Sequence, residues 1–174
     1  CTPFELYASD EVAIFAGGCF WCMEHDMEGL SGVNNVRSGY SGGDSINPSY
    51  QDHKGHQEAV NILFDPELIT YDSLLIAYWR NIDPLNGKGQ FCDKGDSYRP
   101  VIFTSDKTQD DLAKISFDKV AQELKIPKGR IKVQIKKSSR FWPAEDYHQN
   151  YAELNKLKYN FYRYSCGRDK RLNE

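Results

Sequence analysis

The sequence contains no long apolar run, and neither sign of charge dominates it. No stretch of about 18 or more consecutive apolar residues occurs, so we expect no membrane-spanning helix. Lys and Arg total 22 and Asp and Glu total 25, which leaves a formal charge of -3. This balance gives no reason to expect nucleic acid or an anionic membrane as a partner.

Internal repeats, low-complexity segments and linkers are also missing, as is a Gly-rich dinucleotide fingerprint followed by a suitably placed acid. The length of 174 residues therefore predicts one catalytic domain over 1–174, with a core over about 11–157 and a tail over 158–174. We expect this domain to be a monomer.

The five cysteines form an odd number, which argues against a closed disulfide framework and favours reduced or redox-active thiols. The chain begins at Cys1 without a Met. A leader cleaved in front of a cysteine would produce an exported, lipid-anchored protein, whereas trimming of the chain would explain the same start. We favour trimming and expect a cytoplasmic protein.

Apolar patterning and turn residues predict an α+β fold. We expect two layers around a mixed, mainly antiparallel sheet, and a polar, irregular C-terminal tail. Strands are predicted over 11–16, 33–40, 58–64, 100–104 and 131–136. Helices are predicted over 19–30, 71–81, 107–124 and 144–157.

Residues 13–25 read AIFAGGCFWCMEH and place a thiol where a strand becomes a helix. Gly17 and Gly18 allow a tight turn, so Cys19 would face the free N–H groups of the first helical turn. Such a position lowers a thiol pKa from about 8.5 toward roughly 3.5–7.5. Phe20 and Trp21 would form the walls of an apolar slot beside this nucleophile. A buried structural cysteine among core aromatics is the alternative.

Cys19 and Cys22 form a C-x-x-C pair, a spacing that several chemistries use. It suits a thioredoxin-like dithiol, a nucleophile with a resolving thiol, or half of a zinc site. His53 and His56 would supply the other half of a zinc site, although their spacing is short for zinc fingers. A Cys–His protease is a further possibility, since four histidines are available.

Two long loops precede strands and hold further polar candidates. Glu58 lies where the first loop enters a strand, and desolvation beside an apolar slot would make it an acid near neutral pH. The second loop contains FCDKGDSYRP, in which Asp93, Tyr98 and Arg99 could bind a small polar oxygen. For each residue, ordinary loop or surface chemistry is the simpler interpretation.

Four segments in order resemble the peptide methionine sulfoxide reductase A family. They are GGCFWCME, GHQEAVNILFDP, FCDKGDSYRPVIF and FWPAEDYHQNY, and together they span most of the chain. The resemblance implies an α+β two-layer fold with a long, coiled C-terminal segment. It also implies reduction of the S epimer of methionine sulfoxide, free or in proteins, back to methionine.

The same resemblance implies roles for individual residues. Cys19 matches the nucleophile and Glu58 the acid that protonates the sulfoxide oxygen. The groups that hold that oxygen match Tyr50, Asp93 and Tyr98. The pocket for the methyl group matches Phe20 and Trp21, and His148 supports the site from behind.

Attack by Cys19 would release methionine and leave a sulfenic acid, which a second thiol converts to a disulfide. Thioredoxin or another external dithiol would then reduce that disulfide, and the chemistry needs no metal, flavin or nicotinamide on this chain. Many relatives have Gly at the position of Cys22 and use cysteines near the C-terminus instead. We favour Cys22 as the resolving residue, with Cys166 second, and Cys92 is a third possibility because it adjoins Asp93.

Overall fold

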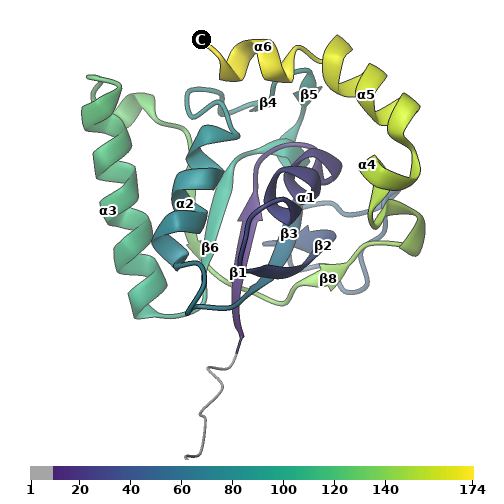
Figure 1. Cartoon of the computed structure of the whole chain (residues 1–174), viewed down its shortest axis with the longest axis horizontal. Helices are drawn as coiled ribbons and strands as arrows, with labels where there is room; N and C mark the ends of the chain where they lie inside the picture. Colours follow the sequence, from purple (N-terminus) through teal and green to yellow (C-terminus); the bar gives the residue numbers. More distant parts are fainter. Residues whose placement is uncertain (1–9) are drawn as a thin grey trace, which may run out of the picture.

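Alternating side chains on strand β1 (Glu11–Ala16) separate two buried clusters on opposite faces of a sheet. Ala13 and Phe15 belong to the large core beneath the helices, and Ile14 and Ala16 belong to a small cluster on the other face. Figure 1 shows the sheet and its helices in a computed structural model that describes residues 10–174. Cys1 lies outside the described residues.

The sheet has six strands in the order β7-β6-β1-β3-β2-β8. Only the β6–β7 pair is parallel among the described strands, which confirms the predicted mixed, mainly antiparallel sheet. The other strands are β2 (Val33–Ser41), β3 (Gln57–Phe64), β6 (Val101–Thr104), β7 (Gln134–Lys137) and β8 (Trp142–Pro143). A separate hairpin pairs β4 (Gly89–Gln90) with β5 (Asp93–Lys94).

The helices begin where the sequence offers caps. Thr70 accepts a hydrogen bond from the Ser73 amide and Asp106 accepts one from the Gln109 amide. The helices are α1 (Phe20–Glu28), α2 (Tyr71–Arg80), α3 (Lys107–Glu123), α4 (Tyr151–Leu154), α5 (Lys156–Ser165) and α6 (Arg168–Leu172). No helix in residues 10–174 is both long and apolar enough to cross a membrane.

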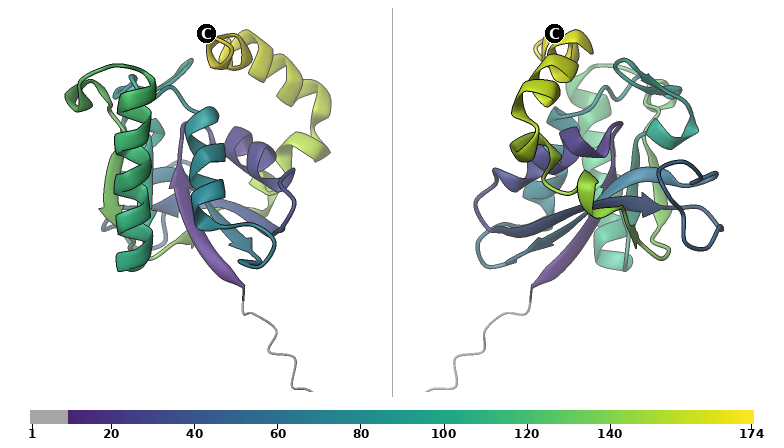
Figure 2. Two further views of the ribbon diagram at one scale, coloured as in Figure 1. Left: turned by 60° about the vertical axis from the view of Figure 1, so that its left-hand side comes forward. Right: turned by 90° about the vertical axis from the view of Figure 1, so that its right-hand side faces the viewer.

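The C-terminal segment differs from its prediction. The helix expected over 144–157 is a 3-10 turn followed by α4, and the tail expected to be irregular forms α5 and α6. Tyr159 and Arg168 are buried against the rest of the fold, and this packing stabilises α5 and α6. The polar composition of the tail did not indicate these helices. Figure 2 shows α5 and α6 crossing the end of the sheet where β1 leads into α1.

Candidate active site

The turn between β1 and α1 holds Cys19 where the sequence predicts it. Gly18 has a φ of +89°, and a Cβ there would lie 2.7 Å from the side chain of Gln90. Cys19 is the N-cap residue of α1, and its carbonyl accepts hydrogen bonds from the amides of Cys22 and Met23. The backbone therefore places this thiol at the positive end of the helix.

Glu58 of β3 points at the same helix terminus. Its Oε2 accepts a hydrogen bond from the Phe20 amide at 3.1 Å, and only 1% of the residue is exposed. Burial raises the pKa of this carboxyl to about 8, against the lowering effect of that amide. Glu58 is therefore a neutral acid at pH 7, as predicted.

The predicted oxygen-binding groups surround Glu58. Tyr98 is close enough to Glu58 to lower the pKa of its carboxyl, and the ring of Tyr50 stacks on Phe20 with centroids 6.4 Å apart. Asp93 is close enough to raise the pKa of Glu58. Arg99 is not part of this cluster, because it forms an exposed ion pair with Asp96 at 2.7 Å.

Aromatic rings enclose the side of the site opposite Glu58. Trp21 stacks on Tyr151 of α4 with centroids 3.7 Å apart. The indole N–H of Trp21 donates to Nδ1 of His148 at 3.1 Å, and the His148 ring also lies 5.0 Å from that of Phe20. His148 thus fixes the orientation of Trp21, which fits the supporting position predicted for it.

The charge on the two inner thiols differs from the prediction. Burial raises the pKa of the Cys19 thiol well above its ordinary value, and Cys22 raises it further. The pKa of Cys22 falls to about 7, because the neighbouring Cys19 thiol stabilises the charged form of Cys22 and because Arg168 is near. The prediction that the helix terminus makes Cys19 the thiolate is wrong for this arrangement, in which exclusion of water keeps the proton on Cys19.

Helix α5 closes the site and contributes a residue that sequence analysis missed. The hydroxyl of Tyr162 donates to Oδ2 of Asp93 at 2.5 Å, and the Tyr162 ring packs against the cluster that contains Cys19. As a result Cys19 is only 6% exposed. The helical spacing of Tyr159, Tyr162 and Cys166 in the tail is the signal that could have revealed this helix.

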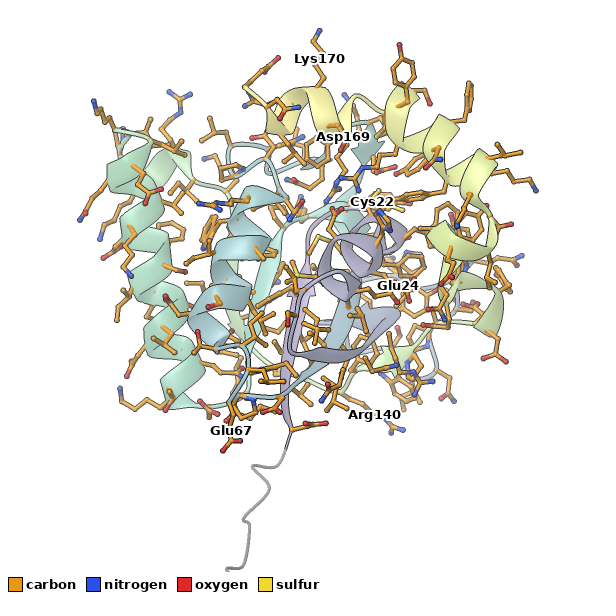
Figure 3. All side chains as sticks on the ribbon, in the orientation of Figure 1. Cys22, Glu24, Glu67, Arg140, Asp169 and Lys170 are labelled. Atoms are coloured by element: carbon orange, nitrogen blue, oxygen red, sulfur yellow. A yellow bond between two sulfur atoms is a disulfide. The ribbon has the colours of Figure 1, made fainter. Side chains whose placement is uncertain are left out.

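The remaining described cysteines, Cys92 and Cys166, form a disulfide that joins the loop after β4 to the end of α5. Cys19 and Cys22 are free and buried. Cys22 packs in one buried cluster with Tyr159 of α5, and Figure 3 shows Cys22 on α1 near the C-terminal helices. Of the three resolving candidates, Cys22 is therefore the free thiol that packs with Cys19, whereas Cys166 and Cys92 are bonded to one another.

Charged residues of α5 and α6 attach these two helices to α1, to the turn before it and to the end of α2. Arg163 forms a 2.7 Å ion pair with Asp26 of α1. The buried guanidinium of Arg168 donates to the carbonyls of Asn81 and Gly17 and lies 4.6 Å above the ring of Phe91. These contacts hold the closing helix over the inner thiols.

The histidines do not form the metal or protease sites considered above. His56 bonds to the Gly43 amide and the Ser45 carbonyl, and His53 bonds to the Ser49 carbonyl. Within residues 10–174, the one cluster of potential metal ligands is Cys92, Asp93 and Cys166. The C-x-x-C pair thus belongs to no group of three or more potential metal ligands there.

Comparisons with known proteins agree with this geometry. The model of the family described as "Peptide methionine sulfoxide reductase" matches residues 11–174. A curated relative, peptide methionine sulfoxide reductase MsrA 2 of Caulobacter vibrioides, is 49% identical over 94% of this chain and 84% of its own.

Two solved structures of Mxr1 from Saccharomyces cerevisiae have the same fold. The reduced form is 28% identical with a TM-score of 0.77, and the match covers 86% of this chain and 87% of that one. The structure in complex with Trx2 is 22% identical with a TM-score of 0.59, covering 87% of this chain and 91% of that one.

Proposed function

Because the chain belongs to the peptide methionine sulfoxide reductase family, we propose that it repairs oxidised proteins by reducing the S epimer of methionine sulfoxide. Free methionine sulfoxide is a substrate as well. One observation carries the assignment of the site: a thiol at the N-terminus of α1 shares that terminus with a carboxyl whose pKa is raised to about 8. A sulfoxide sulfur becomes electrophilic only when its oxygen is protonated or strongly hydrogen-bonded. The carboxyl of Glu58 can supply that proton, and the thiol of Cys19 can supply the nucleophile.

In the first step, Cys22 takes the proton of Cys19, whose sulfur then attacks the sulfoxide sulfur. Glu58 donates its proton to the sulfoxide oxygen, with Tyr50, Tyr98 and Asp93 holding that oxygen. This attack forms a sulfur–sulfur bond between Cys19 and the substrate. The protonated oxygen then passes to the Cys19 sulfur, and both the sulfur–sulfur bond and the original S–O bond break. The products are methionine and a Cys19 sulfenic acid. Phe20 and Trp21 enclose the methyl group of the substrate.

The position of Cys22 makes it the thiol that reacts with the sulfenic acid. Its sulfur attacks the Cys19 sulfenic acid, a sulfur–sulfur bond forms, and the hydroxyl leaves as water with the proton of Cys22. Cys19 is the N-cap and lies outside the regular helix, so its backbone can adjust to the geometry of a disulfide more easily than a residue within the helix.

Thioredoxin, or another protein dithiol, then reduces the Cys19–Cys22 disulfide in a monomeric enzyme, in keeping with the complex formed by Mxr1. Because Cys19 is covered by Tyr162, α5 must shift to admit either a substrate or the reductant. The chemistry uses no resident cofactor.

The decisive experiment is an assay with the two resolved sulfoxide epimers and a thioredoxin system. We expect turnover of the S epimer alone and none in Cys19→Ser. Without reductant, Cys22→Ser should release no more than one equivalent of methionine per chain, more slowly than the wild type, because it lacks the group that takes the proton of Cys19. Peptide mapping after one turnover should find Cys19 linked to Cys22 in the wild type. Turnover by Cys19→Ser would disprove the assigned nucleophile, and reduction of insulin disulfides without sulfoxide turnover would favour a general dithiol oxidoreductase.

A further inference from the structure

The outer disulfide brings together a set of side chains that the reductase mechanism does not explain. Cys92 Sγ, Cys166 Sγ and a carboxylate oxygen of Asp93 all lie within 4.8 Å of one another. We call these three residues the outer thiol site. Cys92 is exposed whereas the inner thiols are buried, so an external dithiol can reach the outer disulfide directly.

The spacing of these atoms suits a tetrahedral cation once the disulfide is reduced. Zinc binds thiolate sulfur at about 2.3 Å and carboxylate oxygen at about 2.1 Å, which places tetrahedral sulfur and oxygen ligands about 3.6 Å apart. Cys92 Sγ and Asp93 Oδ1 are separated by 3.8 Å. The Cα atoms of Cys92 and Cys166 are 4.9 Å apart, so the two thiols remain neighbours after reduction. Their side chains must then rotate to bring the sulfurs to about 3.8 Å from one another, the separation of two thiolates on one tetrahedral zinc ion.

Neighbouring side chains orient the carboxylate of Asp93 and offset part of the negative charge of the three ligands. Tyr162 donates to Oδ2 of Asp93 at 2.5 Å, which leaves Oδ1 on the side of Cys92. A hydrogen bond of this kind to a ligating carboxylate is typical of metal sites. Arg168 is close enough to Asp93 to stabilise its charge, and it offsets part of the negative charge of two thiolates and a carboxylate.

We propose that Cys92, Asp93 and Cys166 bind one Zn²⁺ when the outer disulfide is reduced. An external protein dithiol is oxidised as the disulfide becomes two thiols, and these thiols release two protons when the metal binds. Water occupies the fourth position, because Cys92 lies at the surface. Two thiolates and one carboxylate favour zinc over harder cations.

Zinc at this site would inhibit sulfoxide reduction, and this consequence rests on the proposed function. The metal engages Asp93, which would otherwise help to hold the sulfoxide oxygen. The outer thiol site would therefore bind zinc only in the reduced enzyme and keep that enzyme inactive.

The test titrates the full chain with ZnCl₂ against a chromophoric chelator, in reduced and oxidised forms. We expect one Zn²⁺ per reduced chain, none per oxidised chain, and none in reduced Cys92→Ser. Reduced Cys22→Ser should bind zinc as the wild type does. Tyr162→Phe should weaken binding about 10- to 100-fold, whereas the exposed Tyr164→Phe on the same helix should not change it.

Two results would overturn the proposal: no zinc in the reduced wild type, or binding that is lost in Cys22→Ser and kept in Cys92→Ser. The second would place the metal on the C-x-x-C pair. Asp93→Asn provides a check in which both thiols remain. Unchanged zinc affinity in this variant would show that the carboxylate is not a ligand. Because zinc is measured directly, these outcomes are independent of the reductase assay, in which a failure would concern the proposed function alone.

Discussion

At the scale of single residues, the chemistry depends on opposing influences on one carboxyl. Burial disfavours the charged form of Glu58, and the Phe20 amide favours it. Burial is the larger effect, so the pKa rises to about 8 and the proton is available at neutral pH. Tyr98 then holds the protonated acid in position.

Replacing this acid should affect both the rate and its pH dependence. We expect Glu58→Gln to slow the reductase step by about 10²–10⁴, the usual contribution of a positioned acid. In the wild type the rate of this step should fall above about pH 8, as Glu58 loses its proton, and the variant should lack this decline. Single-turnover kinetics across this pH range measures both effects.

Glu67→Gln is the matched control, since this exposed residue lies at the other end of the molecule from Cys22 (Figure 3). Its rate and pH profile should equal those of the wild type. A wild-type rate in Glu58→Gln would show that another group supplies the proton.

At the scale of elements, the turn from β1 to α1 places the thiol. Gly18 adopts a φ of +89°, and no side chain fits there without moving Gln90. Gln90 itself is buried and bonds to Asp83 and Asn86, so it has little freedom to move. The turn and the loop after β4 therefore constrain one another.

Gly18→Ala should destabilise the protein by about 1–3 kcal/mol, through backbone strain and this contact. Gly29, at the other end of α1, is the control: its φ is -73° and nothing lies within 4 Å of a Cβ there. Gly29→Ala should leave stability unchanged or raise it by about 0.4–1 kcal/mol. Urea unfolding measures both, and equal effects would contradict this account of the turn.

At the scale of the whole molecule, two buried carboxyls connect stability to pH. Burial raises the pKa of Glu24 to about 7 and that of Glu58 to about 8. The folded state therefore retains these protons at pH values where the unfolded chain, with its ordinary value of 4.5, has released them. Stability from these groups is present below about pH 4.5 and is lost as pH rises toward 8.

The double variant Glu24→Gln, Glu58→Gln should therefore lose less stability than the wild type between about pH 4.5 and 8. The difference in the free energy of unfolding between the wild type and the double variant, followed over pH, gives the contribution of these two carboxyls alone. Denaturant unfolding at several pH values measures it. Parallel pH profiles for the two chains would show that neither pKa is raised.

Much of the fold and part of the site follow from local sequence. The strand at Glu11–Ala16 has the predicted bounds, and α2 and α3 differ from prediction by single residues at their ends. The Gly-Gly turn correctly placed Cys19 at a helix start. The family motifs named Glu58, Asp93 and Tyr98, which lie near one another in the structure, and their roles stay predictions. Such signals act between near neighbours in the chain, through alternation, capping and backbone freedom.

Only the tertiary structure decided which thiols pair and where their charge resides. Cys92 and Cys166 are 74 residues apart, and no local pattern indicates that they meet. Tyr162 reaches Cys19 because α5 packs across α1, and the resulting burial reverses the expected order of the thiol pKa values. The sequence by itself determined which reactive groups the chain contains. Contacts between distant segments determined which groups carry a proton, because a pKa depends on burial and neighbouring charge.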